Sequence, residues 1–432
     1  MMKSVCVLGM GYIGLPTAIT FAKYGMIVHG VDINQKIIDK LQSGEIHIEE
    51  PGLQNIFQEV LTAGNLTFGT IPVTADAYII SVPTPINSDN TANIDYVVSA
   101  ANSIIPYLKP NALVVLESTV PPRTVEDHLI PILSQSHLRI GEEVFVSHSP
   151  ERVIPGRLLE ELINNDRVIG GINEQSVEMT KKLYSCFVKG KMHSTDATTA
   201  EMVKLMENTY RDINIAFANE MALIAEKIGF NVWEAIRLAN FHPRVNIHRP
   251  GPGVGGHCIA VDPWFIYEQA PNIAKLVHTA RLTNDYMPNF VAEKTKHLLE
   301  GIEKPKIAVL GLAFKGNVDD MRESPAVSII KKITEFATVS VYDPHVKENW
   351  NSKVDSYEEC LLNADLLLLL TDHNEFTTLS PKYASQLMKN KIIFDTRNLF
   401  ESKAWVEQGF DVHLIGNSSL ATLNLISNLS NA

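Results

Sequence analysis

The feature that most constrains the fold is a glycine turn near the start of the chain. An apolar segment at 4–8 predicts a buried strand and runs directly into Gly9-Met10-Gly11-Tyr12-Ile13-Gly14. A helical pattern follows over 15–24, and a second strand over 27–31 ends at Asp32. Strand, glycine turn, helix, strand and acid, in this order, are the fingerprint of a βαβ unit that binds a dinucleotide.

Each residue of this fingerprint has a physical task. Gly9 allows the turn, Gly11 lets the pyrophosphate approach, and Gly14 lets the helix pack on the strand. Asp32 can accept hydrogen bonds from the adenosine ribose and repel a 2′-phosphate. We therefore expect NAD, rather than NADP, as the cofactor.

Two further predicted strands end beside threonines. The strand at 77–82 leads to Thr84, and the strand at 113–116 leads to Thr119. The carboxyl ends of strands in a doubly wound sheet carry its ligand-binding loops. Both hydroxyls are therefore candidates for contact with the dinucleotide, although they could equally be ordinary loop hydroxyls.

Much of this pattern of strand, glycine turn and acid recurs in the second half of the chain. An apolar run at 306–310 enters Gly311-Leu312-Ala313-Phe314-Lys315, and a strand at 339–342 ends at Asp343, which echoes Asp32. The later turn lacks the GxGxxG form, so it predicts a nucleotide-binding relative that no longer holds NAD. The fold class predicted is α/β, with two Rossmann-like doubly wound domains joined by a central helical domain.

The region between the halves is helical. Asp196 or Thr198 can cap a helix that runs to Ile228, with Gly229 as its stop. One face of this helix carries Lys204, Asn208 and Arg211. Apolar residues flank that face and predict burial, and a buried cation needs anionic partners. The flanking residues are Val203, Met206, Ile213 and Phe217.

A second glycine-rich loop, at 250–256, precedes a cysteine. Four glycines and two prolines in those seven residues disfavour both helix and strand and suit a close approach to a ligand. Cys258 follows, with His257 beside it and Asp262 four residues on. The backbone N–H groups of such a turn would favour a thiolate, which makes Cys258 a candidate nucleophile. The alternative is a small buried cysteine that packs as a hydrophobe.

Composition narrows the class of protein. The chain has 432 residues, enough for two or three domains, and its net charge of −12 argues against nucleic acid or an anionic membrane surface as partner. Four cysteines without CxxC spacing indicate neither a disulfide framework nor a zinc finger, so we expect no metal.

The strand at 4–8 leaves no room for a signal peptide, and we expect a cytoplasmic protein. The uncharged stretch after Gly416 predicts partial disorder.

At this point the chain resembles the UDP-glucose/GDP-mannose dehydrogenase family over nearly its whole length. The matching motifs are GMGYIG at Gly9, Ser118-Thr119, Ser149-Pro150-Glu151-Arg152, the helix with Lys204 and Asn208, GVGGHC before Ile259, and GLAFK at Gly311. His257 before the cysteine and the segment 240–247 are similar to the UDP-N-acetyl-D-mannosamine dehydrogenases within that family, although UDP-N-acetylglucosamine 6-dehydrogenases share GGHC.

The resemblance implies three domains and a cysteine-dependent oxidation. The domains are an NAD-binding domain at 1–190, a central helical domain at 191–298 that forms a homodimer, and a UDP-binding domain at 299–432. The implied reaction is a four-electron oxidation at C6 of a UDP-sugar, which uses two NAD and water and serves surface polysaccharide synthesis. Cys258 would trap the aldehyde as a thiohemiacetal and then carry a thioester.

The resemblance also implies the site residues. The catalytic candidates are Cys258, Lys204, Asn208, Glu151, Asp262 and Thr119. Glu151 and Asp262 are the alternatives for activating water, and Glu151 could instead be a structural partner of Arg152. The cofactor candidates are Gly9, Gly11, Tyr12, Ile13, Gly14, Asp32, Thr84, Thr119 and Arg322. The substrate candidates are Arg152, Val153, Lys204, Asn208, Arg211, His242, Arg244, Gly255, Phe314, Lys315 and Arg397, with His242 and Arg244 as readers of the sugar.

Three other functions remain open at this stage. UDP-N-acetylglucosamine or UDP-glucose could be the sugar oxidised. A two-electron NAD dehydrogenase with a structural Cys258 is a rival enzyme, although such an enzyme has no need of a second nucleotide-type domain. A non-catalytic nucleotide-sugar sensor is a rival of another class, although Lys204 and Cys258 are both present. A metal site built from His248, His257, Cys258 and Asp262 lacks closed zinc-ligand spacing.

Overall fold

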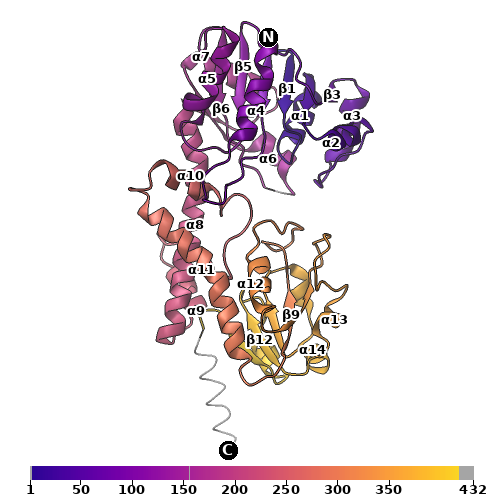
Figure 1. Ribbon diagram of the computed structural model, residues 1–432, viewed down its shortest axis with the longest axis vertical. Helices are drawn as coiled ribbons and strands as arrows, with labels where there is room; N and C mark the ends of the chain where they lie inside the picture. The colour runs from indigo at the N-terminus through magenta and orange to yellow at the C-terminus, as the bar shows by residue number, and fades with distance from the viewer. Residues whose placement is uncertain (1, 155, 418–432) are drawn as a thin grey trace, which may run out of the picture. The chain divides into compact units, whose positions relative to one another are not determined.

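A computed structural model of the chain describes residues 2–154 and 156–417 (Figure 1). The stretch predicted to be partly disordered lies almost wholly outside these residues. The chain divides into two compact units. Unit 1 holds Met1–Glu207 and Trp264–Pro271, and unit 2 holds Asn208–Pro263 and the chain from Asn272 onward. The domain boundaries at 190/191 and 298/299 stay predictions.

Unit 1 is built on a mixed sheet in the order β3-β2-β1-β4-β5-β6-β7-β8. All neighbouring pairs are parallel except β6 and β7, which are antiparallel. The strands are β1 Ser4–Leu8, β2 Ile27–Val31, β3 Leu66–Gly69, β4 Ala77–Ile80, β5 Ala112–Leu116, β6 Val144–His148, β7 Arg167–Gly171 and β8 Met192–Asp196. The helices are α1 Gly14–Lys23, α2 Gln35–Gln42, α3 Leu53–Thr62, α4 Asp95–Ile104, α5 Ile130–Leu133, α6 Leu158–Asn164 and α7 Glu174–Tyr184.

The central strands of this sheet are buried on both faces. Every residue of β4, β5 and β6 is buried. Successive residues of β5 alternate between two apolar clusters, with Leu113 and Val115 in one and Val114 and Leu116 in the other. A parallel sheet covered by helices on both sides leaves the loops at its carboxyl edge as the place for a ligand.

Unit 2 contains a second, wholly parallel sheet in the order β10-β9-β11-β12-β13. The strands are β9 Lys306–Leu310, β10 Thr338–Tyr342, β11 Leu366–Leu369, β12 Ile392–Asp395 and β13 Asp411–Leu414. The helices around it are α12 Pro325–Ile333, α13 Tyr357–Leu361, α14 Pro381–Leu387 and α15 Ser402–Val406. The predicted fold class is confirmed by these two doubly wound sheets and the long helices between them.

Each sheet has an aspartate whose carboxylate binds the start of its first strand. In unit 1 the Asp76 carboxylate accepts hydrogen bonds from the N–H groups of Lys3 and Ser4, at the start of β1. In unit 2 the Asp365 carboxylate accepts one from the N–H of Lys306, at the start of β9. In both halves this aspartate follows an alanine and precedes a buried strand, at Ala75-Asp76 and Ala364-Asp365, so the two sheets repeat the same contact.

In the sequence, the chain between the two sheets forms the helices α8 Ala197–Ile228, α9 Val232–Ala239, α10 Asp262–Gln269 and α11 Lys275–Leu298. Of these, α8 and α11 are long. Asp196 caps α8, because its carboxylate accepts a hydrogen bond from the N–H of Thr199 at 2.8 Å. Gly229 ends it in a left-handed conformation, with φ of 93°. Both predicted ends of this helix are confirmed.

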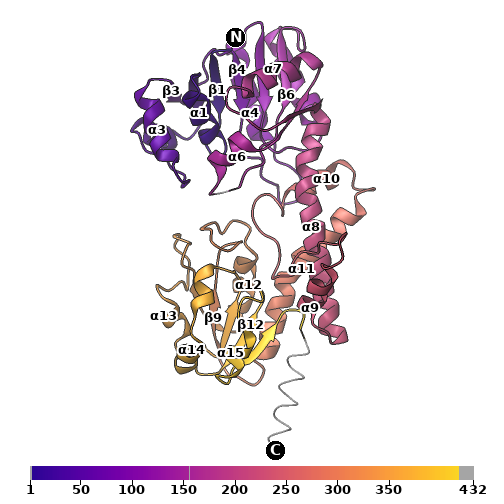
Figure 2. The same ribbon diagram turned by 180° about the vertical axis from the view of Figure 1, so that it is seen from behind.

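The helix α11 lies along α8, as both views show (Figures 1 and 2), and buried polar side chains join the two within unit 2. Arg281 donates to the Asp212 carboxylate at 2.5 Å, and Asn284 donates to the same oxygen at 2.8 Å. Burial raises the pKa of Asp212 to about 6 against the opposing effect of Arg281. The described helices include none long and apolar enough to cross a membrane.

Candidate functional site

The three glycines of the first turn have the surroundings that the fingerprint predicts. A Cβ on Gly9, where φ is 93°, would lie 2.3 Å from the carbonyl oxygen of Ser81. A Cβ on Gly14 would lie 1.9 Å from the carbonyl oxygen of Gly9. A Cβ on Gly11 would meet nothing within 4 Å. Gly9 and Gly14 therefore serve the packing of the chain, whereas the open space at Gly11 is where a pyrophosphate fits.

Acidic side chains hold this turn from two sides. The Asp32 carboxylate accepts hydrogen bonds at 2.9 Å from the N–H groups of Met10 and Asn34. The Tyr12 hydroxyl donates to Glu50 at 2.7 Å, and Glu50 also accepts from the N–H groups at the start of α6. The turn is thus preorganised, and Asp32 is only half-buried and keeps lone pairs for ribose hydroxyls. Glu50 is a supporting residue that sequence reasoning missed.

The two threonines at the carboxyl edge of the sheet meet. The Thr84 hydroxyl donates to the carbonyl oxygen of Thr119 at 2.6 Å. The loops after β4 and β5 are thereby joined. Thr119 is half-buried, and its own hydroxyl makes none of the protein hydrogen bonds described for this region, so it is the better placed of the two for a ligand.

Glu151 has a different cationic partner from the one considered in the sequence. Its carboxylate pairs with the Arg167 guanidinium at 2.5 Å, and both side chains are more than nine-tenths buried. The Arg152 guanidinium pairs instead with Glu207 at 2.7 Å, and only the backbone N–H of Arg152 reaches Glu151. Glu151 is therefore a partner of Arg152 through the backbone N–H alone, and its ion-pair partner is Arg167.

The burial predicted for the cationic face of α8 is found only in part. Asn208 is buried and Lys204 is half-buried, but Arg211 is exposed. The flanking Met206 and Phe217 are 58% and 47% exposed. The predicted burial therefore holds for Asn208 and is wrong for Arg211, Met206 and Phe217, which stay exposed in the single chain.

The cysteine loop belongs to unit 2, and Cys258 is exposed. This excludes the reading of Cys258 as a small buried hydrophobe. A Cβ on Gly255 would lie 2.5 Å from the carbonyl oxygen of Glu323, and one on Gly256, where φ is 80°, would lie 2.9 Å from the Phe314 ring. The glycines therefore let the loop lie directly on the segment that follows β9.

The same loop leads into α10 through the residues around Asp262. The N–H of Asp262 donates to the Cys258 carbonyl at 2.8 Å, which closes a turn before the helix. The buried Asp262 carboxylate accepts a hydrogen bond from the Asn208 side-chain amide at 2.6 Å. Two catalytic candidates predicted from separate motifs thus touch, and the acid fixes which way the amide points.

Cations surround this loop in unit 2. Arg322 and Cys258 interact electrostatically, while the hydrogen bond from Arg322 to Asp320 is the main cause that raises the pKa of Arg322. Arg397 pairs with Asp372 at 2.9 Å, and its guanidinium lies 2.7 Å from where a Cβ on Gly251 would be. A cation near a thiol favours the thiolate, so Arg322 could assist Cys258 as well as bind an anion.

The residues proposed to recognise the sugar, His242 and Arg244, lie on a loop that hydrogen bonds hold closed. Asn240 bonds to the backbone of Ile247 in both directions, at 2.7 and 3.0 Å, and so closes the segment that carries His242 and Arg244. Both of those side chains are exposed, as is Lys315, while Phe314 is half-buried. Arg152 and Val153 lie in unit 1, whereas the remaining substrate candidates except Lys204 lie in unit 2.

The acid beside the second glycine turn is fully engaged by the protein. Asp343, the counterpart of Asp32, accepts from the N–H groups of Leu312 and Ala313 at 2.7 and 3.0 Å and from the His373 ring at 3.0 Å. Hydrogen bonding from His373 counteracts burial and holds the pKa of Asp343 well below its ordinary value. A buried carboxylate saturated in this way cannot serve a ribose.

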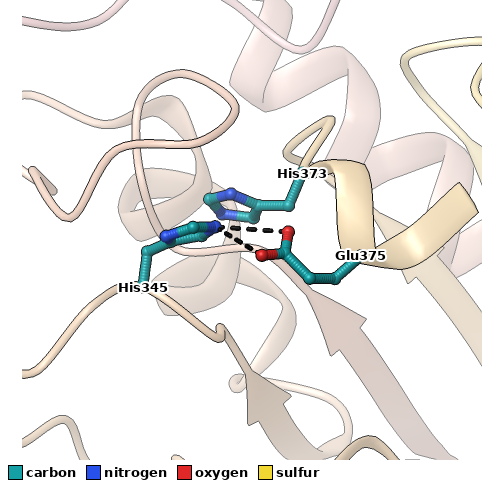
Figure 3. A group of neighbouring side chains, drawn as sticks. All are labelled: His345, His373 and Glu375. Carbon is teal, nitrogen blue, oxygen red and sulfur yellow. Dashed lines mark hydrogen bonds and ion pairs between the residues drawn. The ribbon is translucent and has the colours of Figure 1, made fainter. Parts of the chain in front are cut away.

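His345, His373 and Glu375 gather beside this carboxylate (Figure 3). The His345 and His373 rings stack at 4.7 Å, and His345 pairs with Glu375 at 3.1 Å. Nδ1 of His373 accepts from the N–H of Asn317, so its Nε2 carries the proton that faces Asp343. With both nitrogens of His373 engaged, the cluster stabilises the turn rather than offering three ligands to a metal.

Three family models match successive parts of the chain. Models of the UDP-glucose/GDP-mannose dehydrogenase family match its NAD binding domain at residues 3–188, its central domain at 198–286 and its UDP binding domain at 308–402. The first match confirms the predicted cofactor, NAD.

Individual relatives match over almost their full length. UDP-N-acetyl-D-mannosamine dehydrogenase of Methanococcus maripaludis is 47% identical over 427 residues, which cover 96% of this chain and 98% of that protein. NDP-N-acetyl-D-galactosaminuronic acid dehydrogenase of Ralstonia nicotianae is 45% identical, with 93% and 97% covered. The solved structure of UDP-N-acetyl-mannosamine dehydrogenase Cap5O from Staphylococcus aureus is 46% identical, with a TM-score of 0.89 and 96% and 99% of the two chains covered.

The glycine geometry predicts opposite outcomes for two alanine variants. Gly14→Ala should lower stability by about 1–3 kcal/mol or more, because its Cβ collides with the Gly9 carbonyl. Gly11→Ala should leave the thermal midpoint unchanged but weaken NAD binding by about tenfold, because its Cβ enters the ligand's space. Thermal unfolding without ligand and calorimetric titration with NAD measure the two effects. Equal loss of stability in both variants would contradict this assignment.

Proposed function

Because the chain belongs to the UDP-glucose/GDP-mannose dehydrogenase family, we propose that it oxidises UDP-N-acetyl-D-mannosamine at C6 to the uronate, with two NAD and water consumed per sugar. The observation that carries the proposal is an exposed thiol, Cys258, on a glycine loop that lies against the turn of the second nucleotide-type domain. The relatives named for this sugar support the choice of substrate.

The chain's own residues can supply each step. NAD, when bound, accepts a hydride from C6 in each of the two oxidations. The hydroxyl proton leaves to Lys204, directly or through water, while Lys204 and the Asn208 amide stabilise the oxyanion. The Cys258 thiolate adds to the aldehyde carbon and forms a thiohemiacetal, which is oxidised to a thioester. Water then hydrolyses the thioester and releases the carboxylate and the thiol.

Contacts within each unit suggest how two carboxylates divide the remaining work. Asp262 is buried and bound to the Asn208 amide, which suits it to orient that amide toward the oxyanion. Glu151, which follows β6 at the carboxyl edge of the unit 1 sheet, is then the candidate to activate water. The substrate contacts of Arg152, Val153, Arg211, Gly255, Phe314, Lys315 and Arg397, and those of Arg322 and Thr84 with the cofactor, belong to the same proposal.

The sugar is the least constrained part of this proposal, because a relative at 45% identity is named for a galactosaminuronic acid. We assign recognition of the sugar to His242 and Arg244 on their pinned loop. A role in surface polysaccharide synthesis rests on the family resemblance, and a cytoplasmic location stays a prediction.

A parallel assay separates the candidate substrates and the rival reactions. Purified protein with NAD should convert UDP-N-acetyl-D-mannosamine faster than UDP-N-acetylglucosamine, UDP-glucose or UDP-N-acetylgalactosamine and should release two NADH per sugar. Absorbance of NADH and chromatography of the uronate give both numbers. One NADH per sugar would leave Cys258 a structural role, no turnover with any sugar would favour the nucleotide-sugar sensor, and a preference for UDP-glucose would contradict the use of His242 and Arg244.

Removing the nucleophile should separate chemistry from cofactor binding. Cys258→Ala should slow uronate formation on the order of a thousandfold, because no thioester can form, while the affinity for NAD stays unchanged. Cys186→Ala is the matched control, since that half-buried thiol packs against the apolar core of unit 1. Uronate made by Cys258→Ala at the normal rate would refute the mechanism.

We also propose a homodimer through the central helices. The stripe on α8 at Met206, Tyr210 and Phe217 is 58%, 64% and 47% exposed, with a spacing of four and seven residues that keeps all three on one helix face. An exposed aromatic stripe of this kind suits the core of a symmetric interface.

A charge in the stripe should dissociate the dimer. Tyr210→Glu should shift the mass measured by light scattering from dimer to monomer, because the ionised carboxylate would be buried without a partner. Ile71→Glu is the control, because Ile71 is 63% exposed in unit 1 and lies outside the stripe. A wild-type protein that runs as a monomer, or a Tyr210→Glu protein that stays dimeric, would contradict this interface.

A further inference from the structure

A buried cluster of ionisable groups lies behind Glu151 in unit 1. Arg167, at the start of β7, stands between two carboxylates: Glu151 at 2.5 Å and Glu117 at 3.4 Å. Glu117 directly follows β5, and its side chain is fully buried. The Tyr184 hydroxyl, at the end of α7, donates to Glu117 Oε1 at 2.5 Å, and the Tyr184 ring lies 4.3 Å from the Arg167 guanidinium.

The charges of this cluster do not balance when every group is ionised. Two carboxylates and one guanidinium leave one buried negative charge, which is costly in a low-dielectric interior. Glu117 Oε2 is buried and accepts no hydrogen bond from any described residue. Burial raises the pKa of Glu117 to about 7. The positive charge of Arg167 opposes this shift, and the negative charge of Glu151 adds to it. The uptake of one proton by Glu117 near neutral pH restores the balance.

We propose that Glu117 is a positioning residue that tunes Glu151 through Arg167. When Glu117 is ionised, it shares the positive charge of Arg167 and repels Glu151, so the Glu151 carboxylate is a stronger base. When Glu117 is protonated, Arg167 serves Glu151 alone and weakens it as a base. The charged and titratable groups that face Glu117 are Arg167, Glu151 and Tyr184. This role rests on the proposed function, in which Glu151 activates water.

The kinetic signature is a step between two plateaus rather than a loss of activity. In the wild type, kcat should rise roughly threefold as the pH increases through neutrality. This estimate takes the coupling between Glu117 and Glu151 as about one pKa unit and lets the logarithm of the rate follow half of that change. In Glu117→Gln the step should be absent, with kcat at the lower plateau throughout. In Tyr184→Phe the step should move to higher pH, because the ionised Glu117 loses its hydroxyl donor.

The matched control is Glu201→Gln. Burial also raises the pKa of Glu201 to about 7, but this carboxylate accepts from the N–H groups of Arg123 and Val125 and touches none of the cluster. Its loss should leave the step at the same pH, whatever it does to stability. A purely structural role for Glu117 or Tyr184 would lower kcat by one factor at all pH values without moving the step.

Infrared spectroscopy tests the coupling without turnover. Protonated Glu117 and protonated Glu201 should each give a C=O band that vanishes through neutral pH in the wild type. The band that is missing in Glu117→Gln but kept in Glu201→Gln belongs to Glu117. In Glu151→Gln the same band should vanish at lower pH, because the repelling charge is gone. A band with the same midpoint in Glu151→Gln, or a kinetic step that survives in Glu117→Gln, would overturn the proposal. Coupled bands in a protein that oxidises no UDP-sugar would overturn the proposed reaction instead and leave the electrostatic coupling standing.

Discussion

The structure depends on one arrangement that occurs twice: a carboxylate at the end of a second strand accepts backbone N–H groups from the turn after the first. Asp32 does this for Met10 in unit 1, and Asp343 does it for Leu312 and Ala313 in unit 2. In unit 1 the turn keeps open space at Gly11 for a ligand. In unit 2 the buried Leu312 lies in the turn, and the Asp343 carboxylate also binds the His373 ring, so this acid stabilises the turn.

The fold and the nucleotide turn could be predicted from the sequence because their determinants are local. The spacing of Gly9, Gly11 and Gly14 within one βαβ unit predicts their tasks, even though the atom that leaves no room for a side chain at Gly9 is the carbonyl oxygen of Ser81, after β4. The partner of Glu151 could not be predicted in this way. Arg167 meets Glu151 because β6 and β7 are antiparallel, with His148 opposite Gly170, and that single reversal in a parallel sheet carries no local sequence signal.

The error on α8 has a related physical cause. Apolar residues around a helix predict that its surface is covered, but the pattern contains no information about which chain covers it. Tyr210 and Phe217 remain exposed in the single chain, so packing within that chain does not explain why aromatic residues stand at these positions. The proposed homodimer would account for this exposure without any change in the helix, whose predicted ends at Asp196 and Gly229 hold.

The two chemical tasks proposed for this protein require opposite surroundings, and the chain supplies them in different units. A nucleophile must reach its carbon, so Cys258 stands exposed on glycines that no side chain could replace. A base that works at neutral pH needs a basicity set by its neighbours, so Glu151 is held in a buried ion pair that also involves Glu117. With a net charge of −12, such a protein can favour an anionic substrate only through local cations. Arg167 is buried beside Glu151. Attraction of an anionic substrate is therefore left to exposed cations such as Arg322 and Lys315 in unit 2.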